Sequence, residues 1–276
     1  MIGQYLSPAY PPLRRWILRT WGVADLHLRQ QWQAVWPRLR RHARRSVRCL
    51  DAGCGAGLWT LELARRLPAW QLTGLDRDAR ALERGRGLGR RLGSRLGRRL
   101  GAPGIEWIAS GFLAYHPAEP YDLVLSINSA HYMIAAGLGA ELFERFCDWL
   151  RPGGELILVV PRRLAEIPAA RCLPYSTANK QVTTRQLLDL AARPAFELCE
   201  QVPFVGRPGV WAQQIDLAAA RHRLVHAAAY PALALLAAFD DLPGKSLLPS
   251  ASPATPSAYW LLRLRKRTHP LESHHA

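Results

Sequence analysis

A strand that runs directly into a glycine-rich turn constrains the fold of this chain most. Residues 47–50 have the apolar pattern of a short buried strand, and residues 58–67 have the pattern of a helix that ends at Pro68. The turn between them contains Gly53, Gly55 and Gly57. Glycines at a strand end let the backbone turn sharply and let a ligand lie against main-chain atoms. The pattern therefore predicts an α/β domain with a ligand site at this turn.

Strand and helix patterns continue to alternate after the turn. Further strands are expected at 71–75, 105–109, 121–127, 155–160, 196–204 and 259–265, with helices at 78–100, 140–150 and 183–192 and a turn at 153–154. Such alternation predicts a parallel sheet whose strands are joined by right-handed crossovers. Residues 121–127 are almost continuously apolar, as is typical of a central strand covered on both faces.

The glycine spacing distinguishes between two classes of cofactor. A dinucleotide fingerprint requires a glycine at position 58, where this chain has Leu58. Asp51 precedes the glycines, and a carboxylate there suits an amine better than a pyrophosphate. Asp76 ends the second expected strand, where a carboxylate can accept hydrogen bonds from both hydroxyls of a ribose. The glycine turn alone leaves NAD or FAD open, and Asp76 strengthens the case for an adenosyl cofactor.

Four segments together resemble the class I S-adenosylmethionine-dependent methyltransferases, in the order of that family. They are LDAGCGAG at 50–57, GLDRD at 74–78, YDLVLSINSAHYM at 121–133 and LRPGGELILVV at 150–160. The similarity covers about residues 47–163 and is closest to the small-molecule type. It implies a doubly wound, Rossmann-like α/β fold with a seven-stranded sheet whose last strand, at 259–265, is antiparallel. It also implies S-adenosyl-L-methionine as cofactor and S-adenosyl-L-homocysteine as product.

The resemblance assigns cofactor contacts to three parts of the chain. The residues expected to bind the cofactor are Asp51, Gly53, Cys54, Gly55, Gly57, Asp76, Arg77, Ser110, Gly111, Phe112 and Asn128. Asp51 and the glycine backbone would hold the methionine part, and Asp76 the ribose. Family members often have an acidic residue near the adenine after the third strand. This chain has Ser110-Gly111-Phe112 there, so adenine recognition would depend on Ser110, the main chain and the Phe112 ring.

The residues that follow the fourth strand face the transferable methyl group in this family. Methyl transfer is an in-line displacement that requires mainly alignment and exclusion of water. His131 is the candidate base and Tyr132 the candidate positioning residue, and the alternative for both is simple packing. The run that begins at Asn128 lacks the Pro-Pro-aromatic motif of enzymes that methylate amines of nucleic-acid bases. No metal site is expected.

We divide the chain into five segments. They are an N-terminal helical cap at 1–46, the cofactor-binding core at 47–205, a helical insertion or lid at 206–258, the final core strand at 259–268 and a disordered tail at 269–276. The insertion is rich in Leu and Ala and contains Trp211, Tyr230 and Phe239. An apolar lid suits a small, hydrophobic or lipid-linked acceptor.

The net charge of +16 indicates an anionic partner or a bias in coding composition, because only three of the 37 basic residues are lysines. Arg84 to Arg99 forms an amphipathic basic helix. Such a helix is either the solvated outer helix that the fold requires, or a contact with an anionic membrane surface or with RNA phosphates. The run lacks the exposed aromatic residues of RNA-binding modules, which counts against nucleic acid.

Cysteine content and hydropathy indicate the cellular location. Five cysteines without CxxC spacing argue against a disulfide framework and a zinc site, and neither a signal peptide nor a membrane-spanning run is visible. We therefore expect a cytoplasmic protein, with peripheral membrane contact as an option. The leading hypothesis is O- or N-methylation of a small or lipid-linked acceptor in secondary metabolite, glycan or lipid biosynthesis. The alternatives are an RNA methyltransferase and a catalytically silent module that binds S-adenosylmethionine.

Overall fold

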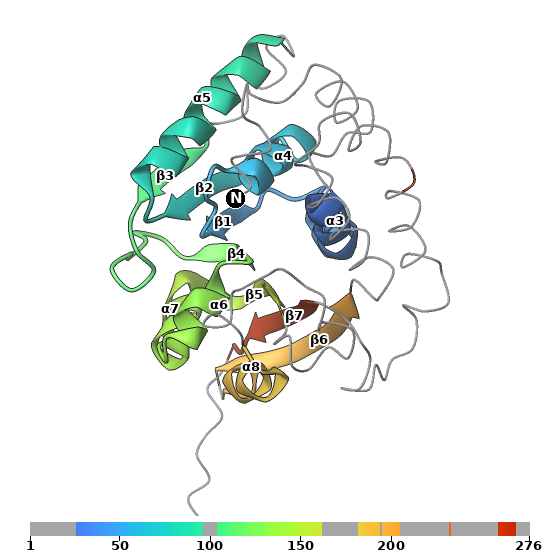
Figure 1. The fold of residues 1–276 in the computed structure, drawn as a ribbon, viewed down its shortest axis with the longest axis vertical. Helices are drawn as coiled ribbons and strands as arrows, with labels where there is room; N and C mark the ends of the chain where they lie inside the picture. The colour runs from blue at the N-terminus through green and yellow to red at the C-terminus, as the bar shows by residue number, and fades with distance from the viewer. Residues whose placement is uncertain are drawn as a thin grey trace, which may run out of the picture.

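The computed structural model describes residues 26–95, 104–161, 182–193, 195–204, 232 and 259–268, which Figure 1 draws in colour. The start of the expected cap, almost all of the expected lid at 206–258 and the expected tail lie outside these residues. Among the described helices, none combines the length and the apolar character needed to cross a membrane.

The described strands form one seven-stranded sheet. They are β1 (Arg48–Ala52), β2 (Gln71–Asp76), β3 (Glu106–Ala109), β4 (Tyr121–Ile127), β5 (Leu150–Pro161), β6 (Phe196–Phe204) and β7 (Tyr259–Lys266). Their order across the sheet is β3-β2-β1-β4-β5-β7-β6. Strands β1 to β5 pair in parallel, whereas β7 is antiparallel to both β5 and β6. The predicted doubly wound sheet with an antiparallel last strand is confirmed.

Helices cover both faces of this sheet (Figure 1). They are α3 (Leu26–Leu39), α4 (Leu58–Arg66), α5 (Ala79–Arg95), α6 (Ala130–Ala135), α7 (Gly139–Trp149) and α8 (Thr184–Ala191), with a short 3-10 helix η1 (Arg40–His42) after α3. Side chains of α3 and α4 belong to one buried cluster, and those of α6, α7 and α8 belong to the other. In β5, Leu158 belongs to the cluster that includes α6, α7 and α8, and its neighbour Val159 belongs to the cluster that includes α3 and α4. The strand is therefore apolar on both sides.

The structure differs from the local predictions in two places. The strand expected at 155–160 begins earlier, because Leu150 already pairs with Tyr121 and the residues expected to form a turn continue β5 through Gly153, whose φ is +76°. Helix α6 was not predicted, because six residues are too few to produce a helical periodicity that stands out from the strand before it.

Candidate functional site

The candidate site is built on a loop of left-handed glycines at the carboxyl end of β1. We call residues 53–57 the glycine loop. Gly53, Gly55 and Gly57 have φ values of +80°, +55° and +68°. The N–H groups of Gly53 and Cys54 both donate to the carbonyl oxygen of Leu75, at 2.8 and 3.0 Å. The loop is therefore fixed against the end of β2, and the spacing of its glycines follows from its backbone conformation.

Two of these glycines lie where no side chain fits, and the third faces open space. A Cβ atom on Gly53 would lie 2.2 Å from the Ser129 Cβ, and one on Gly57 would lie 2.1 Å from the Trp107 ring. A Cβ atom on Gly55 would have nothing within 4 Å. Gly55 therefore presents its main chain to an open volume, which is the geometry needed for a ligand that lies against the loop.

Asp51 lies at the base of the glycine loop and is only 4% exposed. Its Oδ2 atom accepts a hydrogen bond of 2.6 Å from the Thr60 hydroxyl. The pKa of Asp51 is raised from 3.8 to about 6, because burial and, to a smaller extent, the nearby charge of Asp76 raise it more than the hydrogen bonds from Thr60 lower it. The carboxylate is thus anchored to α4, and a cationic group beside it would favour its charged form.

Asp76 connects the end of β2 to the glycine loop. Its Oδ2 atom accepts the Gly55 N–H at 2.8 Å, and its Oδ1 atom accepts the Asp78 N–H at 2.9 Å. A carboxylate has about four acceptor positions, so two main-chain donors leave room for two hydroxyls. Arg77 follows it and is exposed. Asp76, the residue predicted to bind the ribose, is therefore hydrogen-bonded to the glycine loop, which is predicted to hold the methionine part.

The segment after β3 approaches the same loop from another side. Ser110 donates its N–H to the carbonyl oxygen of Asp76 at 3.1 Å, and its hydroxyl donates to the Gly111 carbonyl oxygen at 3.2 Å. The Phe112 ring reaches to 3.1 Å from the position that a Cβ on Gly53 would take. The structure thus brings the residues predicted for adenine next to those predicted for ribose and methionine.

Cys54 is half-buried in the glycine loop, with its sulfur 3.1 Å from the position that a Cβ on Gly74 would take. Burial, together with the charges of Asp51 and Asp76, raises the pKa of this thiol. Its predicted contribution to cofactor binding is therefore that of an uncharged group that packs within the loop, and not that of a thiolate nucleophile.

The acceptor side of the site begins where β4 ends. Asn128 has a φ of +54° and donates its N–H to the Val159 carbonyl oxygen at 2.9 Å. Ser129 donates its hydroxyl to the carbonyl oxygen of Ala52 at 2.7 Å, so β4 and β1 are joined directly below the glycine loop. His131, the candidate base, is only 7% exposed, whereas Tyr132 is 49% exposed, and their ring centroids are 4.0 Å apart.

Two residues of the site, Thr60 and Trp107, were not predicted from the sequence, and Ser129 was expected only as one of the residues after the fourth strand that face the transferable methyl group. Thr60 anchors Asp51, Ser129 joins β1 to β4, and Trp107 packs its ring against Gly57, Gly74 and Gly85. Each of them acts through a contact between strands or helices that are distant along the chain. The sequence signal for Thr60 and Ser129 was a hydroxyl residue in a largely apolar stretch, and the sequence around Trp107 gave no signal of its contact with the glycines.

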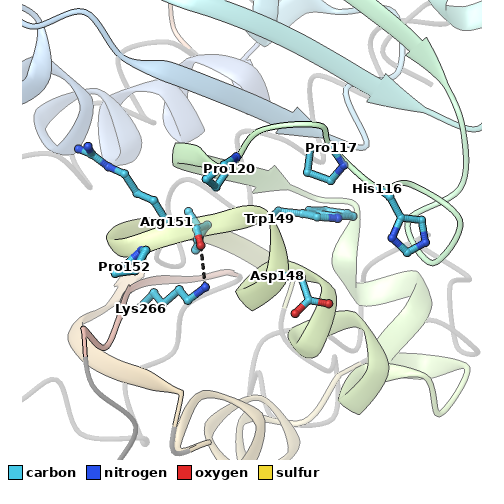
Figure 2. Close-up of a pocket in the computed structure, with 9 residues that line it drawn as sticks. His116, Pro117, Pro120, Asp148, Trp149, Arg151, Pro152 and Lys266 are labelled. Carbon is cyan, nitrogen blue, oxygen red and sulfur yellow. Dashed lines mark hydrogen bonds between the residues drawn. The ribbon is translucent and has the colours of Figure 1, made fainter.

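A hollow of about 460 Å³ lies away from the glycine loop. Figure 2 shows the side chains that line it. It is lined by His116, Pro117, Pro120, Asp148, Trp149, Leu150, Arg151, Pro152 and Lys266. Pro120 and Leu150 adjoin the amino ends of β4 and β5, so the hollow is at the edge of the sheet opposite the glycine loop. The Lys266 ammonium donates to the carbonyl oxygens of Cys147 and Leu150 at 2.8 and 2.7 Å, which caps the end of α7. This hollow is not part of the candidate site.

Comparison with known proteins agrees with this geometry. Residues 49–154 match a family model described as a methyltransferase domain. A trans-aconitate 2-methyltransferase from Rhizobium leguminosarum bv. trifolii is 30% identical over 145 residues, which is 50% of this chain and 50% of that protein. The chain thus spans about half the length of the curated relatives that it matches.

Solved structures extend the similarity of the fold to most of the chain. The N-methyltransferase NodS from Bradyrhizobium japonicum WM9, in complex with S-adenosyl-L-homocysteine, has a TM-score of 0.52 and 17% identity, with 96% of each chain covered. The [4+2]-cyclase SpnF has a TM-score of 0.58 and 22% identity, with 88% of this chain and 82% of that chain covered. At these identities the comparison establishes the fold.

Proposed function

Because residues 49–154 form a class I, S-adenosylmethionine-dependent methyltransferase domain, we propose that this chain binds S-adenosylmethionine and transfers its methyl group to a small, uncharged acceptor. The observation that carries the proposal is the position of Gly55. Its main chain faces open space, and its N–H is held by Asp76. A sulfonium cofactor with a ribose and a free amino acid end matches the chemistry of these groups.

Each residue at the glycine loop would bind a different part of the cofactor. Asp76 would accept hydrogen bonds from the ribose hydroxyls, and the carboxylate of Asp51 would attract the ammonium group of the methionine part. Phe112 would pack against the adenine ring. When bound, the cofactor supplies a methyl group on a good, neutral leaving group, so the protein contributes mainly alignment and exclusion of water.

His131 and Tyr132 would act on the acceptor. His131 is buried at the start of α6 and would take the proton from an acceptor oxygen or nitrogen, because imidazole titrates near neutral pH. Tyr132 is half exposed beside it and would hold the acceptor in line. Residues 128–140 contain no Asp, Glu, Lys or Arg, and both Tyr132 and Leu138 are exposed large hydrophobic residues. This surface favours an apolar, uncharged acceptor over a charged one.

Substitution of Asp76 is the first test of cofactor binding. We expect Asp76→Ala to weaken S-adenosylhomocysteine binding by about 100-fold or more, because two charge-assisted hydrogen bonds are lost and the Gly55 N–H loses its acceptor. Gly55→Trp should abolish binding, because the new ring fills the open volume. Isothermal titration calorimetry measures both, with Gly104→Ala as the control, since a Cβ there also meets nothing within 4 Å. Equal affinity of wild type and both variants would mean that the cofactor binds elsewhere.

The pH dependence of binding tests the assignment of Asp51. With a pKa of about 6, its carboxylate is charged above that pH and protonated below it. The affinity for S-adenosylhomocysteine should be constant near pH 7 and fall by about tenfold for each unit below pH 6, since the α-amine of the ligand stays protonated throughout (pKa about 8). Asp51→Asn should remove this dependence. An unchanged pH profile in the variant would show that Asp51 does not contact the amine.

A further inference from the structure

The candidate base is in contact with an exposed aromatic ring. His131 is 7% exposed and Tyr132 is 49% exposed, and their ring centroids lie 4.0 Å apart at an interplanar angle of 34°. Because the buried ring contacts the exposed one, the imidazole supports the phenol ring. A supported ring that solvent reaches offers a face on which another planar ring can pack.

Main-chain contacts fix this pair of rings at the carboxyl ends of β1, β4 and β5. At the end of β4, Asn128 turns the chain with a φ of +54° and donates its N–H to the Val159 carbonyl oxygen at 2.9 Å. Ser129 donates its hydroxyl to the carbonyl oxygen of Ala52 at 2.7 Å, and its own carbonyl oxygen accepts the Tyr132 N–H at 3.2 Å. The first turn of α6, which carries both rings, is therefore anchored beside the glycine loop.

Charged residues are absent from the described segments that carry and flank these rings. Residues 128–140 contain no Asp, Glu, Lys or Arg, and neither does the carboxyl end of β5, Val159–Pro161. The carboxylates at the glycine loop, Asp51 and Asp76, are assigned to the cofactor. A carboxylate acceptor would need a cationic partner, and an aliphatic amine, with a pKa of about 10.4, would arrive as a cation that needs an anionic one. These segments therefore favour a neutral acceptor.

The strength of the base limits which neutral acceptors can react. An imidazole has a pKa of about 6.5 and a phenol of about 10, whereas an aliphatic hydroxyl is close to water, at about 15.7. Proton transfer to an imidazole is therefore uphill by about 3–4 pKa units from a phenol and by about 9 from an aliphatic hydroxyl, and general-base catalysis favours the smaller gap. A thiol, with a pKa of about 8.5, is also acidic enough, but an aliphatic thiol has no ring to pack on Tyr132.

We propose that the acceptor is a planar phenol, which packs its ring on Tyr132 and presents its hydroxyl to His131. This inference rests on the proposed function and names the class of its acceptor. In the reaction, His131 takes the hydroxyl proton, and the phenol oxygen forms a bond to the methyl carbon. The bond between that carbon and the sulfur breaks, and its electron pair goes to the sulfur. The products are an aryl methyl ether and S-adenosylhomocysteine, and the imidazolium returns its proton to solvent.

Two acceptors with the same carbon skeleton test this class. Purified protein is incubated with S-adenosylmethionine that carries a radioactive methyl group, and with either β-naphthol or its saturated counterpart, decahydro-β-naphthol. Transfer of the label to the acceptor is measured. We expect kcat/KM to be at least about 100-fold higher for β-naphthol, because only its hydroxyl is acidic enough for general-base catalysis by an imidazole. The tricarboxylate trans-aconitate is the charged comparison and should accept no label.

Substitution of Tyr132 tests the packing of the acceptor ring. Tyr132→Leu keeps an apolar side chain but removes the ring, and it should raise KM for β-naphthol by about three- to tenfold with little change in kcat. Tyr132→Phe keeps the ring and should raise KM less. Leu198→Ala is the matched control, because Leu198 is also an exposed large hydrophobic residue but lies on β6, which β5 and β7 separate from β4. It should leave kcat and KM as in wild type.

Substitution of His131 distinguishes a base from a residue that only packs. His131→Asn should lower kcat for β-naphthol by about 100-fold or more. It should lower kcat for para-nitrophenol much less, because that phenol is already largely ionised in mildly alkaline buffer and needs no base. If His131 only packs, the substitution should lower both values by the same factor.

The outcomes separate this inference from the proposed function. Preference for decahydro-β-naphthol or trans-aconitate would overturn the choice of a phenol and leave methyl transfer in place, as would absence of transfer to β-naphthol by a protein that binds S-adenosylhomocysteine. Failure to bind S-adenosylhomocysteine would overturn the proposed function itself. An unchanged KM in Tyr132→Leu, or an equal loss with both phenols in His131→Asn, would show that these rings do not form the acceptor site.

Discussion

Gly57→Ala is expected to lower the free energy of unfolding by about 3–4 kcal/mol and to abolish cofactor binding. Two costs combine at this position. A side chain at φ +68° costs about 1–2 kcal/mol. The added Cβ would lie 2.1 Å from the Trp107 ring, and overpacking of this kind costs about 1–3 kcal/mol. The displaced loop would also move the main chain that faces the ligand. Urea unfolding measures the first effect and calorimetry the second.

Gly55→Ala provides the control for backbone strain. Its φ of +55° is also left-handed, but a Cβ there meets nothing within 4 Å, so the unfolding free energy should fall by only about 1–2 kcal/mol. Adding Trp107→Ala to Gly57→Ala removes the ring, and the double variant should be more stable than the sum of the two single losses predicts. Equal destabilisation by the two alanine substitutions, with no coupling to Trp107, would show that the ring does not limit this loop.

Residues whose role follows from the sequence next to them were predicted. The glycine loop requires left-handed φ values at three positions and a buried strand before them. The sequence shows the first requirement as three glycines and the second as an apolar run. Asp76 was found because an acidic residue ends a strand at a fixed distance from the loop. The order of the strands followed from alternation and from the resemblance, since a parallel sheet with right-handed crossovers allows few topologies.

Residues that act across the fold were not predicted. Nothing local to Trp107 shows that its ring will fill the space opposite Gly57, Gly74 and Gly85, because those positions meet only after β1, β2 and β3 have paired. Ser129 precedes helix α6, but its hydroxyl donates to Ala52 of β1 and does not cap the helix. The sequence also does not show why α5 contains glycines, whereas the structure places Gly85 against the glycine loop and Gly89 against α4.

A charged cluster on the face of the sheet covered by α3 carries the last prediction. Glu155 is 8% exposed and lies 2.9 Å from Arg41 and 3.2 Å from Arg263. Burial raises the pKa of this carboxyl, but a hydrogen bond from His42 and the charges of the two arginines outweigh it and lower the pKa from 4.5 to about 2. The cluster therefore joins the segment after α3 to β5 and β7 through one carboxylate.

Glu155→Gln is expected to lower the free energy of unfolding at pH 7 by about 3 kcal/mol, because the arginines lose their buried counterion. The pKa of Glu155 is lower in the folded state than in the unfolded state. Its contribution is therefore fully present above pH 4.5 and is lost as the pH falls toward 2. The difference between wild type and variant should thus shrink below pH 4.5, as measured by urea unfolding at a series of pH values.

Asp189→Asn is the control for this measurement, because Asp189 is an exposed carboxylate 3.9 Å from Arg185. Its loss should cost less than about 0.5 kcal/mol at any pH, since exposed ion pairs contribute little. Asp51 should act in the opposite sense in the same protein without ligand, because its raised pKa makes its charge unfavourable in the folded state as the pH rises from 3.8 to about 6. If Glu155→Gln costs no more than the control, or if its cost is the same at pH 7 and pH 3, the cluster does not hold α3 to the sheet through this carboxylate.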